Sequence, residues 1–194
     1  MAEGSRGIGP ELQFPERTLR SRLSHWDYWP RFLPTEFAES TGTEALDFID
    51  QKHGFVKEHW EHWGDGGHAY TAPMNHAYFS SEEAQQAIPG VLWLMGFVRP
   101  HLRAQKIGFN VLEPDGETPL HKDPFDVTVF KLLGRGVGSV TDPPNGGITI
   151  LETEPGDMFR LYGQRWSWWR ARHGFTNRQP DEMRVGTYFP DPKR

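Results

Sequence analysis

The 194-residue chain contains no cysteine. Disulfide bonds and thiolate metal sites are therefore excluded, and any bound metal must be held by histidine and carboxylate side chains. Such a ligand set suits Fe, Mn or Zn and does not suit a structural zinc knuckle. The absence of cysteine thus narrows the search for a metal site to a few residue types.

Long apolar runs and an excess of positive charge are also absent. The longest apolar stretch, residues 88–98, is interrupted by Pro89, Gly90 and Gly96 and is about half of the roughly 20 residues that a membrane span needs. Residues 1–24 contain no apolar core long enough for a secretory signal. The net charge of −5 gives no reason to expect a nucleic-acid partner. We therefore expect a soluble, cytoplasmic protein that binds neither membranes nor nucleic acids.

Local patterns divide the chain into an N-terminal arm and one domain. Residues 1–34, rich in Gly, Pro, Arg and Ser, are predicted to form an irregular arm, and residues 35–194 a single domain. Apolar residues at helical spacing over 35–63 predict a helix. A second helical segment is expected to begin at Ser80, which can cap it, and to break at Pro89.

Strand patterns dominate from residue 106 onward and are separated by turns rich in Gly, Pro, Asp and Asn. The predicted strands cover residues 106–113, 117–123, 126–133, 147–152, 157–162, 166–173 and 183–189. Short strands at this spacing favour a sandwich or a jelly roll. The expected fold class is therefore mainly β, with helices over residues 35–105 that support a β core over residues 106–190.

The segment around His121 carries the candidate chemistry. In an extended segment His121 and Asp123 would lie on the same face, because strand side chains alternate. His173, further along the chain, offers a third ligand. Two histidines and one carboxylate with open coordination positions are typical of non-haem Fe(II) oxygenases. Each residue taken singly is explained more simply as a hydrogen-bonded loop residue, but the ordered set favours a metal site.

The motifs around these ligands resemble those of a known enzyme family. Residues 108–189 are similar to the catalytic barrel of the Fe(II)/2-oxoglutarate-dependent dioxygenases, and most similar to the aspartyl/asparaginyl β-hydroxylase and amino-acid hydroxylase branch. The resemblance rests on the lead-in over residues 110–121, on Pro155-Gly156-Asp157, and on His173-Gly174-Phe175-Thr176-Asn177 followed by Arg184-Val185. It implies a double-stranded β-helix, the cupin-like jelly roll, with 2-oxoglutarate and O₂ as cosubstrates. In this family Fe(II) would be held by His121, Asp123 and His173.

The resemblance also assigns a residue to the cosubstrate. Arg184 matches the arginine that binds the far carboxylate of 2-oxoglutarate, for which a guanidinium offers a bidentate and permanently charged partner. On a strand over this segment Arg184, Gly186 and Tyr188 would share a face. The alternative is a surface arginine paired with Asp181 or Glu182.

Two further residues are candidates for the cosubstrate site. Asn110 lies where related enzymes place a small polar side chain near 2-oxoglutarate. Lys131 would share a strand face with Val127 and Val129 and is a rival partner for the carboxylate, ranked below Arg184.

A run of aromatic and basic residues near the second histidine is the candidate substrate site. On a strand over 166–173, Trp169 would share a face with that histidine, and Arg170 and Arg172 would take the other face. Trp169 and one of these arginines are candidates to line a substrate cleft, with Arg160 as a further candidate contact for a carboxylate. The competing interpretation of the tryptophans is packing in the wall of the barrel.

The sequence thus predicts an Fe(II)- and 2-oxoglutarate-dependent dioxygenase that hydroxylates or otherwise oxidises an amino acid, a peptide side chain or a small natural-product intermediate. Asp123 favours hydroxylation or another oxidation over halogenation, because related halogenases carry a small residue in this position to make room for halide. The alternatives are a cupin-type metal-binding sensor or isomerase without 2-oxoglutarate chemistry, and a catalytically silent barrel. The chain lacks the second nearby histidine and the following glutamate of a cupin ligand set, and its intact triad with Arg184 argues against a silent barrel.

Overall fold

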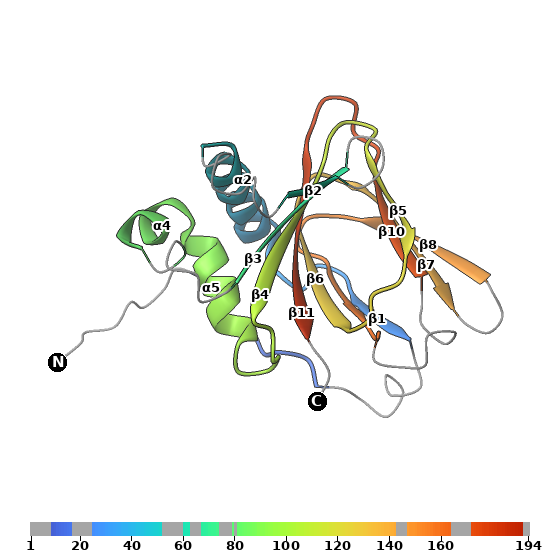
Figure 1. Ribbon diagram of the computed structural model, residues 1–194, viewed down its shortest axis with the longest axis horizontal. Coiled ribbons are helices and arrows are strands. Elements are labelled where there is room, and N and C mark those ends of the chain that lie inside the picture. Colours follow the sequence, from blue (N-terminus) through green and yellow to red (C-terminus); the bar gives the residue numbers. More distant parts are fainter. Residues whose placement is uncertain are drawn as a thin grey trace.

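Strands make up most of the structure, and helices lie on one side of them (Figure 1). The computed structural model describes residues 9–16, 25–51, 60–62, 67–73, 79, 81–142, 147–163 and 172–191. The helices are α2 (Thr35–Gln51), α4 (Glu82–Ala87) and α5 (Pro89–Val98). The strands are β1 (Trp26–Trp29), β2 (Trp60–His62), β3 (Gly67–Pro73), β4 (Lys106–Leu112), β5 (Glu117–His121), β6 (Asp126–Leu133), β7 (Gly136–Asp142), β8 (Gly147–Thr153), β9 (Met158–Leu161), β10 (Arg172–Asn177) and β11 (Arg184–Asp191). None of the helices in these ranges is long and apolar enough to cross a membrane.

The strands form two antiparallel sheets. The larger sheet has the order β1-β9-β6-β11-β4-β3-β2, and the smaller sheet has the order β5-β10-β7-β8. From β4 to β11 the chain changes sheet at every step but one, which is the winding of a double-stranded β-helix. The fold is therefore mainly β, a cupin-like jelly roll with a few helices, and the predicted fold class is confirmed.

Side-chain alternation gives the larger sheet two apolar faces. On β6, Phe130 and Leu132 pack with the helices, whereas Val127 and Val129 pack with residues of the smaller sheet. Burying a side chain of this size contributes about 1.5–3 kcal/mol of transfer free energy. The helices thus cover one face of the larger sheet and the smaller sheet covers the other. The cluster that contains Val127 and Val129 therefore lies between the sheets, inside the barrel, and is called the inner cluster below.

Local signals place the starts of the two short helices well. Ser81 caps α4, and its side-chain oxygen accepts a hydrogen bond of 3.1 Å from Ala84 N. The predicted cap, Ser80, is wrong by one residue. The break at Pro89 is confirmed, because proline takes the first position of α5, where its missing N–H costs nothing.

Other boundaries differ from the sequence prediction because long-range pairing decides them. The helix predicted over 35–63 ends at Gln51, and residues 60–62 instead form β2, which pairs with β3. Within the arm that was expected to be irregular, β1 pairs with β9 at the edge of the larger sheet.

Two strands of the smaller sheet were also missed or misplaced. β7 was not among the predicted strands, but it pairs with both β10 and β8, and the absent side chain of Gly138 makes room for the Phe175 ring. β10 was predicted to end at residue 173 and instead continues to Asn177. Residues 166–171 of that prediction lie outside the described ranges.

A buried carboxylate fastens β1 to the barrel. Asp157 is 2% exposed. Its Oδ2 accepts hydrogen bonds from Tyr28 Oη (2.7 Å) and Glu154 N (2.9 Å), and its Oδ1 accepts one from Arg31 N (2.9 Å). Burial and the adjacent Asp157 carboxylate raise the pKa of Tyr28 above its ordinary value, so the phenol keeps the proton that it donates.

Replacing Asp157 by alanine should lower the free energy of unfolding by about 2–4 kcal/mol, because three donors lose their acceptor. Tyr28→Phe removes only one of these bonds and should cost about 1 kcal/mol. Urea denaturation of both variants measures the difference. Equal losses would show that Asp157 acts through Tyr28 alone.

Candidate metal centre

A bulge in β5 turns His121 into the barrel. The Cα atom of His121 pairs with that of His173, and the Cα atom of Thr118 pairs with that of Phe175. β5 therefore has one residue more than β10 between these paired positions. Regular alternation from the buried Thr118 would turn Leu120 inward and His121 outward, but the extra residue reverses this and leaves Leu120 40% exposed.

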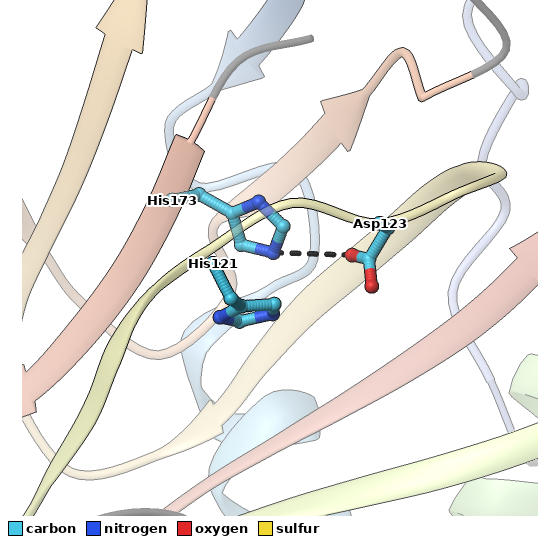
Figure 2. A group of neighbouring side chains, drawn as sticks. All are labelled: His121, Asp123 and His173. Atoms are coloured by element: carbon cyan, nitrogen blue, oxygen red, sulfur yellow. Dashed lines mark ion pairs between the residues drawn. The ribbon is translucent and has the colours of Figure 1, made fainter. Parts of the chain in front are cut away.

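The three predicted ligands converge on one point (Figure 2). His173 Nε2 lies 3.2 Å from Asp123 Oδ2, and the ring centroids of His121 and His173 are 4.2 Å apart. One ligand atom from each residue lies within 4.8 Å of the other two. The strand predicted over 117–123 ends at His121, so Asp123 reaches the cluster from the following loop. The predicted proximity is confirmed, although the extended strand that suggested it stops short of Asp123.

The backbone orients the His121 ring for coordination. Its Nδ1 lies 2.9 Å from the carbonyl oxygen of Pro119. Donation of the Nδ1 proton to this oxygen places the lone pair on Nε2, as metal-binding histidines require. Burial and the neighbouring His173 lower the pKa of His121, which favours the neutral ring.

The chemistry of the donors fits a divalent transition metal. Two imidazoles and a carboxylate suit Fe(II), and three protein ligands on one side leave coordination positions open. In the part of the chain that the structure describes, His121, Asp123 and His173 form the one cluster of this kind. The structure therefore contains a His–Asp–His triad of the type that binds a metal.

Two buried cations lie close to this triad. Arg184 and Lys131 are 1% and 2% exposed. Both lie against the ring of Phe175, with Lys131 Nζ at 3.2 Å and Arg184 Cζ at 5.5 Å from its centroid. The Phe175 ring in turn lies 6.2 Å from the His173 ring. Neither cation forms an ion pair with a carboxylate of the described residues. The buried Asp157 carboxylate acts on both cations electrostatically without forming an ion pair with either, so it offsets their charge only in part.

The guanidinium of Arg184 is held in place by neutral oxygen atoms. Nη1 donates to the carbonyl oxygens of Thr176 (2.5 Å) and Val137 (3.3 Å), and Nη2 donates to Thr153 Oγ1 (2.5 Å). Its Nε is buried without a hydrogen-bond partner. Burial lowers the pKa of Arg184 to about 9, so the side chain is still protonated at neutral pH. The alternative of a surface arginine paired with an acidic neighbour is wrong.

Lys131 and Asn110 belong to one row of residues across three strands. The Cα atom of Gly186 pairs with Asn110 on one side and with Lys131 on the other. Asn110 Oδ1 is buried without a hydrogen-bond partner. Burial, and secondarily the nearby Arg184, lower the pKa of Lys131 well below its ordinary value. The row thus offers an ammonium and an amide on the inner face of the larger sheet, on either side of Gly186.

The strand faces predicted from alternation are confirmed. Val127 and Val129 pack in the inner cluster, against the same Phe175 ring that Lys131 contacts. Tyr188 packs against that cluster, and Arg184 reaches the same ring. An added Cβ at Gly186 would lie 3.6 Å from Lys131 Nζ. Arg184, Gly186 and Tyr188 therefore share the inner face.

Of the four predicted substrate residues, the two that the structure describes lie away from the triad. Arg172 is exposed and adjacent to His173 on β10, so its side chain lies on the opposite, outer face of the smaller sheet. Arg160 lies on the face of the larger sheet that the N-terminal segment covers, with its Cζ 5.6 Å from the centre of the Phe14 ring. Trp169 and Arg170 lie outside the described residues. A role in substrate binding stays a prediction for all four.

Sequence reasoning missed Gly163, which supports the Asp123 loop. An added Cβ at Gly163 would overlap the carbonyl oxygen of Phe125 and lie 2.6 Å from that of Asp123. No local signal reveals this requirement, because the contact joins segments that are distant in sequence.

Gly163→Ala should therefore displace the Asp123 carboxylate and weaken metal binding about 10- to 100-fold, the range typical of lost support around a metal site. Titration calorimetry with Mn(II) measures the affinity. Gly96→Ala is the matched control, since an added Cβ on that α5 glycine would meet no atom within 4 Å. Unchanged affinity in Gly163→Ala would mean that the loop adjusts without moving the carboxylate.

Comparison with known proteins supports the fold and not a closer relationship. No protein-family model and no curated protein sequence matches the chain. The structure is similar to the carbocyclase SnoK, a non-haem α-ketoglutarate-dependent enzyme from nogalamycin biosynthesis, with a TM-score of 0.60, 17% identity, and coverage of 94% of this chain and 87% of SnoK. It is also similar to a Pseudomonas putida prolyl-4-hydroxylase (TM-score 0.55, 13% identity, 88% and 94% coverage) and to the α-ketoglutarate-dependent epimerase SnoN from the same pathway as SnoK (0.54, 17%, 88% and 78%). At these identities the likeness shows a shared double-stranded β-helix.

Proposed function

We propose that the protein is an Fe(II)- and 2-oxoglutarate-dependent oxygenase that oxidises a small molecule or a peptide side chain. The observation that carries this proposal is the position of two buried cations, which form no ion pair among the described residues and are offset only in part by Asp157, beside a His–Asp–His triad. A metal triad alone would also suit a cupin-type sensor or isomerase. The adjacent anion site is the feature that a 2-oxo dicarboxylate needs in addition. A cytoplasmic location and the lack of nucleic-acid and membrane partners stay predictions.

Different residues of the chain would bind the metal and the cosubstrate. His121, Asp123 and His173 would hold Fe(II). When bound, Fe(II) and 2-oxoglutarate supply the oxidising chemistry, in which O₂ is consumed and succinate and CO₂ are released. Lys131 and Arg184 would neutralise the far carboxylate of the cosubstrate in a region from which water is largely excluded.

The contacts favour Lys131 as the group that meets the carboxylate. Both Nη atoms of Arg184 already donate to protein oxygens, among them Thr176 O and Thr153 Oγ1. Lys131 Nζ instead lies over the Phe175 ring, 3.2 Å from its centroid. We propose that Lys131 binds the carboxylate directly and that Arg184 contributes a second positive charge behind it. This reverses the ranking drawn from the sequence.

Anaerobic addition of 2-oxoglutarate to the Fe(II)-loaded protein should produce the weak visible charge-transfer band of a bidentate chelate. His121→Ala, Asp123→Ala and His173→Ala should each abolish 2-oxoglutarate turnover without unfolding the domain, which circular dichroism checks. Full activity in any of these variants would remove that residue from the triad. Fe(II) binding without the band would support the cupin-type alternative.

Lys131→Met should weaken 2-oxoglutarate binding by about 1.5–3 kcal/mol, the cost of losing one charge-assisted hydrogen bond. Arg184→Lys, which retains the charge, is the comparison and should lose less. Titrations of the charge-transfer band give both affinities, and metal affinity measured without cosubstrate should not change. A larger loss of 2-oxoglutarate affinity in Arg184→Lys would mean that Arg184, and not Lys131, is the main partner of the carboxylate.

Lys131→Met should stabilise the protein in the absence of cosubstrate by about 1–4 kcal/mol, because it replaces a buried charge with an apolar side chain. The pKa of Lys131 is lower in the folded protein than in the unfolded chain, so the unfolded state binds more protons between the two values. The contribution of Lys131 to stability therefore rises with pH in this interval, and Lys131→Met should lose that rise. Urea denaturation at pH 7 and pH 9 measures both effects.

A further inference from the structure

We infer that the outer face of the smaller sheet binds a second copy of this chain. The inference goes beyond the proposed function, because it concerns the side of that sheet opposite to the metal centre. It follows from the exposed apolar side chains of this face and from the charges at its two ends.

The exposed apolar side chains gather on one surface. In the described ranges three large apolar side chains are exposed, namely Leu120 (40%), Ile148 (57%) and Ile150 (63%). Leu120 belongs to β5 and the two isoleucines belong to β8, the first and last strands in the order of the smaller sheet. Figure 1 shows this sheet on the side of the molecule away from the helices. Single exposed apolar residues are common, whereas a group of them on one face is typical of an interaction surface.

Strand pairing places most of these side chains in one row. Gly174 lies between the two inward-facing residues of β10 and therefore on the outer face. It pairs with Ser139 on β7, which pairs in turn with Ile150 on β8. A Cβ added to Gly174 would lie 3.4 Å from Leu120 N, so Leu120 lies at the β5 end of the same row. These four residues are called the middle row below, and Ile148 faces outward in the next row.

The metal centre explains only part of this exposure. The bulge in β5 that turns His121 inward also turns Leu120 outward. β8 has no such irregularity in its pairing with β7, so Ile148 and Ile150 face outward by ordinary alternation. Polar residues are the norm on the solvated face of an antiparallel sheet. The two isoleucines are therefore explained by contact with another molecule.

The charged side chains lie at opposite ends of this face. Toward one end Arg172 is exposed on β10, and Lys122 is exposed at the same level, directly after β5. Toward the other end Glu117 on β5 and Glu152 on β8 are exposed, in the row that contains Thr176 of β10. The middle row itself carries no charge. The face thus has a positive end, an uncharged centre and a negative end.

This pattern is complementary to itself. A two-fold axis along the middle row exchanges the two ends, so that Lys122 and Arg172 of one copy meet Glu117 of the other. The same operation sets Ile150 against Ile150 and Leu120 against Leu120. The apolar side chains are then buried at the centre, and the charges of the two copies match. A second copy of the chain therefore fits this face.

The size of the face limits the strength of the dimer. Four strands at a spacing of about 4.8 Å make it about 14 Å wide, so it offers less than the roughly 800 Å² per partner of a standard interface. The dimer should therefore form reversibly, and the monomer should predominate in dilute solution.

Sedimentation velocity between micromolar and millimolar protein concentrations should show this change from monomer to dimer. Ile150→Lys should weaken dimerisation about ten-fold or more, because it sets two ammonium groups against each other at the two-fold axis. Thr43→Lys is the matched control, since it adds the same charge at an exposed position of α2 and should leave dimerisation unchanged. A monomer at every concentration, a dimer that Ile150→Lys leaves intact, or an equal loss in both variants would overturn the inference.

An exchange of charges between copies tests the two-fold arrangement. Arg172→Glu and Glu117→Lys should each weaken dimerisation, because each sets like charges against each other. An equimolar mixture of the two variants should associate about ten-fold more tightly than either variant alone, since residues 172 and 117 regain opposite charges across the interface. No gain in the mixture would overturn this arrangement, and is also what association through the edge of β8 would give. Dimerisation requires neither Fe(II) nor 2-oxoglutarate, so its failure would leave the proposed function standing.

Discussion

The pairing of β5 with β10 is the constraint on which the candidate site depends. It sets His121 opposite His173, and the extra residue in β5 brings both imidazoles to the inner face. The bulge also orients the imidazole ring of His121, since Pro119 lies within the bulged segment and its carbonyl oxygen contacts the ring nitrogen. Thr118 stabilises the register next to the bulge by accepting a hydrogen bond of 2.8 Å from Phe175 N. One local irregularity thus determines ligand position and ligand orientation together.

The Phe175 ring lies between the His–Asp–His triad and the two buried cations, Lys131 and Arg184. Its ring contacts Lys131 and Arg184 on one side and packs at 5.6 Å from the Phe159 ring on the other. Cation–π contact partly offsets the cost of burying the two positive charges, but it does not replace a carboxylate. The two buried positive charges are therefore offset only in part within the described residues. Stability sacrificed at a binding site in this way is common where ligand binding restores it.

Glycine residues allow close approach of neighbouring segments at several places in the structure. Gly163 lets β9 run directly under the Asp123 loop, and Gly138 gives the Phe175 ring its space in the smaller sheet. Gly156, with φ of +96°, occupies a left-handed conformation that side chains other than glycine adopt only with strain, next to the Asp157 bonds that attach β1. Gly163 thus lies against the Asp123 loop, Gly138 lies beside the Phe175 ring, and Gly156 lies where β1 is attached.

The sequence by itself determined the fold class, the residues of the candidate metal centre and the faces of the strands. Residue alternation was sufficient to place Lys131 with Val129, and Arg184 with Tyr188, because alternation is a property of the extended backbone alone. The lack of cysteine and the order of His121, Asp123 and His173 restricted the metal chemistry without any knowledge of contacts.

Only the tertiary structure decided which of these side chains meet. β1 and β7 are strands because of partners distant in sequence, and their own residues carry weak strand signals. Only the tertiary structure shows that both Nη atoms of Arg184 already donate to oxygen atoms of the protein. Such facts arise from hydrogen bonds and packing between distant segments, which local sequence patterns do not encode.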